Sequence, residues 1–189
     1  MANFKILLFG SMLIGLVLGC EKAEEQAQTH LAVEETSYGT PTAHEPLLPQ
    51  IGTELVSGQL VFVPAYSSIR ISAKGDDLSA SHVSIRNTSL TESLKLRFVD
   101  LYGDNGALLR NYIQEETEIP PLGSKLYVVR QAEKLGGGGS NYLVEWISNE
   151  PITPPFIESV TYRYAGTKAM AFSSPAMVLR QVDVTPSAK

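Results

Sequence analysis

The sequence has few cysteines and histidines and no cluster of basic residues. It contains one cysteine and three histidines, and a transition-metal site such as a zinc site draws several of its ligands from these two residue types. The 15 Lys and Arg residues are scattered and the formal net charge is -5, whereas nucleic-acid binding depends on clustered positive charge. We therefore expect no transition-metal site and no nucleic-acid partner.

A long apolar run is also missing. The stretch from Ile6 to Leu18 has 13 residues, whereas a helix that crosses a bilayer needs about 20. It follows Lys5 near the start of the chain and has the length of a signal-peptide core. We therefore interpret residues 1–19 as a signal peptide and not as a membrane-spanning helix.

The single cysteine directly follows this stretch. Val17-Leu18-Gly19-Cys20 resembles the bacterial lipobox, in which a small residue precedes a cysteine that is acylated, for example with palmitate, and becomes the mature N-terminus. A lone thiol in an exported protein would otherwise be reactive. The pattern therefore predicts that a lipid on Cys20 attaches the protein to a membrane. Leu18 departs from the Ala or Ser of many lipoboxes, and an ordinary signal peptide with a chance cysteine, or an uncleaved anchor, remains an alternative.

The residue after the cysteine bears on the membrane that holds the lipid. Glu21 stands where lipoproteins retained at the inner membrane typically have aspartate. We expect a protein of the bacterial cell envelope that faces the periplasm and, where the host has an outer membrane, is attached there.

Residues 20–57 read as an acidic, flexible tether. The segment carries seven Glu and few large apolar residues, a composition that cannot form a core of its own. Two of the three histidines, His30 and His44, lie in it. A flexible chain of this length has an r.m.s. end-to-end distance of roughly 30–35 Å. A short helix from Glu21 to Ala32 is an alternative that leaves the tether role unchanged.

Residues 58–184 have the pattern of a single all-β domain, followed by a short disordered tail at 185–189. Apolar and polar residues alternate, as at Val83 and Ile85, and Asn105-Gly106 between two apolar runs is a strong hairpin signal. After Phe98 the apolar residues change face, which indicates a bulge or a strand buried on both sides. We predict an antiparallel, immunoglobulin-like β-sandwich of eight or nine short strands, without the disulfide of antibody domains.

No set of catalytic residues is recognisable. His82 is the only histidine in the folded part, on the polar side of a predicted strand, and a general base there is less favoured than a solvated side chain. Calcium needs only oxygen ligands, and the candidates lack the spacing of a calcium loop. These candidates are Asp76-Asp77, the Asp100/Asp104/Asn105 turn and Glu115 to Glu118. We assign no catalytic residue, metal ligand or cofactor, and an unrecognised hydrolase remains an alternative.

Four consecutive glycines precede a strand-like run. A phosphate-binding loop would place a Lys after the last Gly and then a helix, but Ser140 and an aromatic, β-branched run follow instead. The glycines therefore predict a turn that adopts positive φ or passes close to neighbouring backbone. A small-ligand or ion-binding site at this turn is an alternative function. Its candidate residues are Gly136, Gly137, Gly138, Gly139, Tyr142 and Trp146.

Several segments together resemble one bacterial family. They are VPAYSSI from Val63, SIRNTS from Ser84, PPLGSKLYVV from Pro120, GGGGSNYLVEW from Gly136 and PFIESV from Pro155. The family is a domain of unknown function found in small exported proteins and lipoproteins, with a G-G-S-G-A-N-F-like segment before V-x-W. This sequence departs from it mildly at Ser140 and Tyr142. The resemblance implies a single exported domain and brings no activity or catalytic residues with it.

The sequence thus predicts a lipid-anchored, non-enzymatic β-sandwich that binds or supports another component of the cell envelope. The lipobox and the lack of a catalytic set are the two observations behind this prediction.

Overall fold

The computed structural model describes residues 39–46, 57–72 and 75–183. Cys20, the predicted signal peptide, the C-terminal tail and most of the predicted tether lie outside these ranges. Regular structure in the described residues consists of twelve β-strands and one short 3-10 helix, Gln131–Glu133. No helix among them has the length and apolar character required to cross a membrane.

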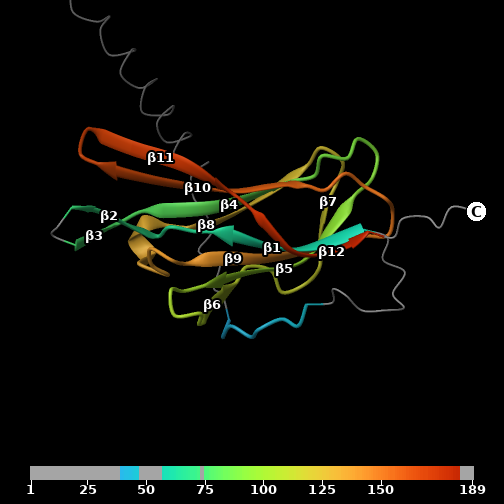
Figure 1. The fold of residues 1–189 in the computed structure, drawn as a ribbon, viewed down its shortest axis with the longest axis horizontal. Helices are drawn as coiled ribbons and strands as arrows, with labels where there is room; N and C mark the ends of the chain where they lie inside the picture. Colours follow the sequence, from blue (N-terminus) through green and yellow to red (C-terminus); the bar gives the residue numbers. More distant parts are fainter. Residues whose placement is uncertain (1–38, 47–56, 73–74, 184–189) are drawn as a thin grey trace, which may run out of the picture. The chain divides into compact units, whose positions relative to one another are not determined.

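Ten of the strands form two antiparallel sheets, and the other two form a hairpin (Figure 1). The six-stranded sheet has the order β12-β1-β9-β5-β6, with β7 pairing β5. Its strands are β1 (Ser57–Pro64), β5 (Leu94–Tyr102), β6 (Leu108–Asn111), β7 (Thr117–Ile119), β9 (Asn141–Ser148) and β12 (Met177–Asp183). The four-stranded sheet has the order β11-β10-β4-β8. Its strands are β4 (Ala80–Arg86), β8 (Ser124–Val129), β10 (Phe156–Ala165) and β11 (Lys168–Pro175). The hairpin pairs β2 (Ser68–Ser72) with β3 (Gly75–Leu78).

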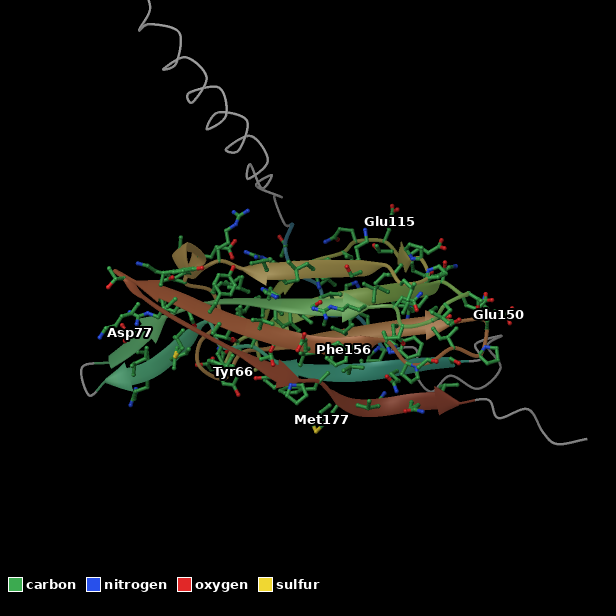
Figure 2. The ribbon with its side chains drawn as sticks, turned by 90° about the horizontal axis from the view of Figure 1, so that it is seen from above. Tyr66, Asp77, Glu115, Glu150, Phe156 and Met177 are labelled. Carbon is green, nitrogen blue, oxygen red and sulfur yellow. The ribbon has the colours of Figure 1, made fainter. Side chains whose placement is uncertain are left out.

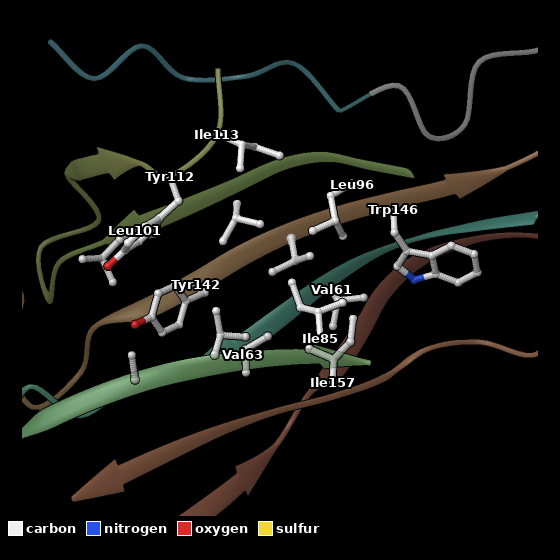
Figure 3. Packing of buried hydrophobic residues seen from close by; sticks show 14 of the residues in the cluster. Val61, Val63, Ile85, Leu96, Leu101, Tyr112, Ile113, Tyr142, Trp146 and Ile157 are labelled. Carbon is white, nitrogen blue, oxygen red and sulfur yellow. The ribbon is translucent and has the colours of Figure 1, made fainter. Parts of the chain in front are cut away.

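The two sheets pack face to face around one hydrophobic core, so the predicted antiparallel β-sandwich is confirmed. Figure 3 shows Val61 and Trp146 of the six-stranded sheet beside Ile85 and Ile157 of the four-stranded sheet. Because side chains alternate along a strand, Tyr142, like Trp146, points to the core from β9, and both side chains are buried.

Three strands were not predicted from the sequence pattern, so the structure has twelve strands where eight or nine were expected. They are β2, β3 and β7, each of three to five residues. β3 contains Asp76 and Asp77, and aspartate is depleted in strands. Segments this short have too few residues to show a period of two.

The β5–β6 hairpin confirms two predictions. Gly106 has a φ of +74° in the turn, where Asn105 Oδ1 accepts a hydrogen bond from the N–H of Ala107. The pairing of β5 with β9 shifts register between Leu96 and Phe98, so β5 contains the predicted irregularity. Both faces of the strand are buried after it, since Phe98 is 0% exposed but is not part of the core between the sheets.

The described part of the predicted tether, Gly39–Pro46, contacts the six-stranded sheet, and we call it the strap (Figure 1). The His44 ring stacks on Phe98 with centroids 5.1 Å apart, and its Nδ1 lies 3.0 Å from Asp100 Oδ2. Asn111 Oδ1 accepts the N–H of Thr42 at 2.8 Å, and Asn111 Nδ2 donates to the Thr42 carbonyl at 3.0 Å. The tether predicted over residues 20–57 thus includes a stretch bound to the domain.

Replacing Asn111 by Ala should destabilise the domain by about 2 kcal/mol, because the buried Asp100 carboxylate loses a donor. Asn111 Nδ2 donates to Asp100 Oδ1 at 2.8 Å, and the same residue makes both bonds to Thr42. Urea denaturation measures the change. Asn105→Ala is the control, because it removes only an exposed bond and should cost less than about 1 kcal/mol. Equal midpoints for the two variants would show that the Asn111 contacts add nothing to stability.

Candidate binding site

The glycine-rich segment connects the two sheets. It leaves β8 of the four-stranded sheet through the 3-10 helix Gln131–Glu133 and enters β9 of the six-stranded sheet. We call residues 136–140 the glycine turn. β8 and β9 belong to different sheets, so the turn joins the layers of the sandwich and is not a hairpin loop.

The glycine turn is hydrogen-bonded to the loop between β1 and β2. The N–H of Gly137 donates to Ser67 Oγ at 2.8 Å, and the N–H of Ser67 donates to the Gly137 carbonyl at 3.1 Å. The N–H of Ala65 donates to the Ser140 carbonyl at 2.8 Å, while Ser140 Oγ donates to the Ala65 carbonyl at 2.9 Å. These two reciprocal pairs fix one loop against the other.

A third loop, the turn between β5 and β6, meets the glycines through Asp104. Asp104 Oδ1 accepts the N–H of Gly139 at 3.2 Å. A Cβ at Gly137 would lie 2.1 Å from Asp104 Oδ2, and a Cβ at Gly136, where φ is +96°, would lie 2.6 Å from Ser67 Oγ. The glycines therefore provide positive φ and close approach, as the sequence predicted. Two of their N–H groups are already bonded within the protein.

A pocket of about 450 Å³ opens beside the glycine turn, and we call it the glycine-turn pocket. Its lining includes Tyr66, Ile69, Arg70, Asp76, Gly138 and Phe172. These residues come from the β1–β2 loop, the β2–β3 hairpin, the glycine turn and β11. In Figure 2, Asp77 lies at one end of the sandwich and Glu150 at the other, and Tyr66 lies between Asp77 and the middle, so the pocket is in the half of the sandwich that contains the β2–β3 hairpin.

The pocket combines aromatic and charged groups. The rings of Tyr66 and Phe172 meet edge to face with centroids 5.5 Å apart. At the rim, Arg70 Nε donates to Asp76 Oδ1 at 2.8 Å. The hydrogen bond and the charge of Asp76 raise the pKa of Arg70, which remains cationic. A ligand with an apolar body and a polar or charged group fits this lining, since binding pockets are mostly apolar with a few polar groups that fix orientation.

An ion pair joins the β2–β3 hairpin to the β10–β11 hairpin beside the pocket. Arg163 Nη2 of β10 lies 2.7 Å from Asp77 Oδ1 of β3. Arg163 is half-buried, so the contact is screened less than one between two exposed side chains. It links the β10–β11 hairpin to the β2–β3 hairpin, and the pocket takes lining residues from both.

The structure separates the residues that the sequence grouped as a candidate site. Gly138 lines the pocket, whereas Gly136, Gly137 and Gly139 pack against the neighbouring loops. Tyr142 and Trp146 are 0% and 1% exposed. These two candidates for the alternative ligand-binding site have side chains that fill the core and do not line the pocket.

The buried aromatics have partners within the protein. Tyr142 Oη donates to the Ser81 carbonyl at 3.2 Å, and Trp146 Nε1 donates to Gln59 Oε1 at 3.2 Å. Burial raises the pKa of Tyr142 well above its ordinary value.

Sequence reasoning missed the residues that form most of the pocket. Tyr66 lies in one of the segments that carry the family resemblance, VPAYSSI, but nothing in the pattern shows that its ring is outside the core. Arg70 and Asp76 lie on the strands that were not predicted. Phe172 is far from them in sequence and reaches the pocket through the pairing of β11 with β10. Only the folded chain brings these segments together.

His82 and several of the acidic residues singled out in the sequence contact neighbouring side chains. His82 lies on β4 beside the Tyr162 ring, with centroids 5.9 Å apart; burial lowers its pKa, and it does not line the pocket. Asp76, Asp77 and Glu116 are each paired with an arginine. Within residues 39–46, 57–72 and 75–183, no three His, Cys, Asp or Glu side chains are grouped closely enough to hold a metal ion.

The structure is an all-β sandwich. Its candidate binding site is a pocket formed by loops and hairpins of the sandwich. The chain belongs to the family described as Protein of unknown function (DUF3124), whose model matches residues 58–179. This confirms the resemblance to a family of unknown function. The matched region contains the glycine turn and all the pocket residues named above.

Other comparisons add little. No curated protein matches the sequence. A solved structure titled "Crystal Structure of Thermotoga maritima 1070" is similar at 15% identity with a TM-score of 0.39, covering 66% of this chain and 96% of that chain.

Replacing Gly136 by Ala should destabilise the domain by about 2 kcal/mol, because an L-residue is strained at positive φ and the new methyl group meets Ser67. Gly138→Ala is the matched control, since the nearest atom to its Cβ is the Ser68 carbonyl oxygen at 3.5 Å. Thermal or urea denaturation of both variants gives the comparison. Similar losses of stability in the two variants would contradict the structural role assigned to Gly136.

Proposed function

We propose that this protein is a lipid-anchored, non-enzymatic binding module of the bacterial cell envelope, which recognises another envelope component at the glycine-turn pocket. The observation that carries the proposal is the pocket itself. It is built from the β1–β2 loop, the glycine turn, the β2–β3 hairpin and β11, and it presents aromatic rings beside an ion pair.

The anchor rests on the sequence. The lipobox-like Val17-Leu18-Gly19-Cys20 supports acylation of Cys20, and Glu21 after it favours the outer membrane over the inner membrane. A periplasm-facing domain in this proposal meets its partner while it is attached to the membrane surface. The membrane is then the first partner, through the lipid, and the ligand of the pocket is the second.

The lining supports binding more than catalysis. Asp76, the carboxylate among the described lining residues, is paired with Arg70, and these lining residues include no histidine. General acid–base catalysis needs a group that can take and give a proton at the reacting atom. A paired, exposed carboxylate at the rim is better suited to orient a ligand.

A small molecule is a second candidate for the same pocket. Its volume of about 450 Å³ lies within the roughly 300–1,000 Å³ of small-ligand sites. Binding of a small molecule would keep the site and change only the class of ligand.

Replacing Cys20 by Ser in the full-length chain should abolish acylation and release the domain from the membrane fraction, because serine cannot form the thioether of a lipoprotein. Metabolic labelling with a fatty acid and membrane fractionation in cells measure the two effects. The substitution lies outside the described domain, so its folding should be unchanged by circular dichroism. Labelling and membrane attachment that persist in the variant would refute the anchor.

A photo-cross-linking residue placed at Arg70, on the pocket rim, should give one discrete adduct in cells. The same residue at Leu126, exposed on β8 away from the pocket, is the control and should not give that adduct. Tyr66→Ala should weaken the Arg70 adduct, because it removes a ring from the lining. The same adducts from both positions, or none from either, would contradict the proposed binding site.

A further inference from the structure

β11 has one edge without a partner strand in the described structure. It is one of the two outer strands of the four-stranded sheet, and in the described structure it pairs with β10 alone (Figure 1). Lys168 begins the strand and Pro175 ends it, and the six residues between them, Ala169–Ser174, carry no charge. All of β11 is exposed except Ser174, which is half-buried.

The turn before β11 decides which backbone groups point outward. Gly166 and Thr167 form a two-residue turn between the paired residues Ala165 and Lys168, and Gly166 has a φ of +60°. In such a hairpin the closing pair is hydrogen-bonded, and bonded and non-bonded pairs alternate from there. Ala169, Ala171 and Ser173 therefore direct their N–H and C=O groups away from β10.

This stretch of edge lacks the features that usually protect a free strand. Natural edges are blunted by charges, proline, bulges or a covering segment. The register of β11 with β10 runs without a shift from Lys168 to Pro175, and the charge and the proline stand only at its two ends. An uncharged, regular, exposed edge of this length is a template for another strand.

The pocket lies beside the same strand. Because side chains alternate along β11, Met170 and Phe172 share one face, and each is 37% exposed. Phe172 lines the glycine-turn pocket and contacts the Tyr66 ring. A strand added along β11 would carry alternate side chains past Met170 and Phe172 toward the pocket.

We propose that β11 binds an extended segment of another polypeptide by β-strand addition, with one apolar side chain of that segment inserted in the glycine-turn pocket. This rests on the proposed function and names the class of its partner. Backbone pairing along a sheet edge supplies affinity, and a pocket for alternate side chains supplies specificity. Lys168 at the start of β11 is the charged residue of this strand and is cationic, so the segment has an acidic residue at the end that lies beside Lys168.

A polypeptide fits these features better than the two other occupants. A small molecule could fill the pocket but would leave the outward N–H and C=O groups of Ala169, Ala171 and Ser173 to water. A second copy could pair its β11 antiparallel to this strand, centred on Ala171. The Met170 and Phe172 of the second copy would then face Phe172 and Met170 of the first. Each Phe172 already lines the pocket of its own molecule. The pocket would then remain unfilled.

The test uses the full-length acylated protein in detergent and a fluorescent synthetic peptide. The peptide alternates valine and threonine, has a central phenylalanine for the pocket, and has glutamate at both ends. Ala171→Pro removes an outward N–H without breaking a bond to β10, and edge strands tolerate proline at such positions. Ala171→Val keeps the N–H and is the matched control. We expect wild type and Ala171→Val to bind within about twofold of each other, and Ala171→Pro to bind at least about tenfold more weakly.

A second comparison tests the inserted side chain. Tyr66→Ala should weaken binding of the phenylalanine peptide more than binding of a peptide with a central alanine. The expected difference is about fivefold or more. Equal losses for the two peptides would overturn the insertion. Circular dichroism confirms the fold of each variant; if Ala171→Pro does not fold, Ser173→Pro removes another outward N–H and replaces it.

The outcomes separate this inference from the proposed function. No binding of the peptide to wild type, or equal binding to Ala171→Pro, overturns strand addition, while an adduct at Arg70 in cells keeps the pocket as a binding site. Self-association of the wild type that the proline variant loses, without peptide binding, assigns the edge to a second copy and also overturns the inference. If the cross-linker at Arg70 gives no adduct in an otherwise wild-type chain, the proposed function is refuted as well.

Discussion

The reciprocal hydrogen bonds between Ser67 and Gly137 are the contact on which the arrangement of loops around the glycine-turn pocket depends. They fix the connection between the two sheets against the loop that leads out of β1. Because Gly137 and Gly139 have no side chains, Asp104 from a third loop can approach the same segment and accept the N–H of Gly139. The rings and charges of the pocket then have a fixed base, although they come from segments far apart in the chain.

The sequence was sufficient for the fold class and insufficient for the site. Alternation along β9 showed that Tyr142 and Trp146 share a face, and the structure places that face in the core. The pattern could not show which face is buried, so these two rings were candidates for the alternative ligand-binding site as well as for the core. The hairpin at Asn105-Gly106 was predictable because its signal is local. The pocket was not predictable, because Tyr66 and Phe172 meet only through long-range strand pairing.

β3 is poor in apolar residues and is joined to its neighbours by ion pairs. β3 has the sequence GDDL, and its two aspartates pair with Arg70 on one side and Arg163 on the other. The exposed Arg70–Asp76 pair lies within the β2–β3 hairpin and adds little stability. The Arg163–Asp77 pair reaches β10 and so helps to orient the hairpin with respect to that strand.

The strap has a consequence for how far the domain can travel. If Cys20 holds the lipid, the first described contact with the domain comes at Thr42, which is 22 residues along the chain. A chain of that length spans at most about 75 Å when fully extended. If the strap were released, the connecting chain would extend to Ser57, where β1 begins. Its maximum length would then be roughly 125 Å. With such an anchor, the bonds of Asn111 and Asp100 would limit the distance between the domain and the membrane, and breaking them would increase that distance.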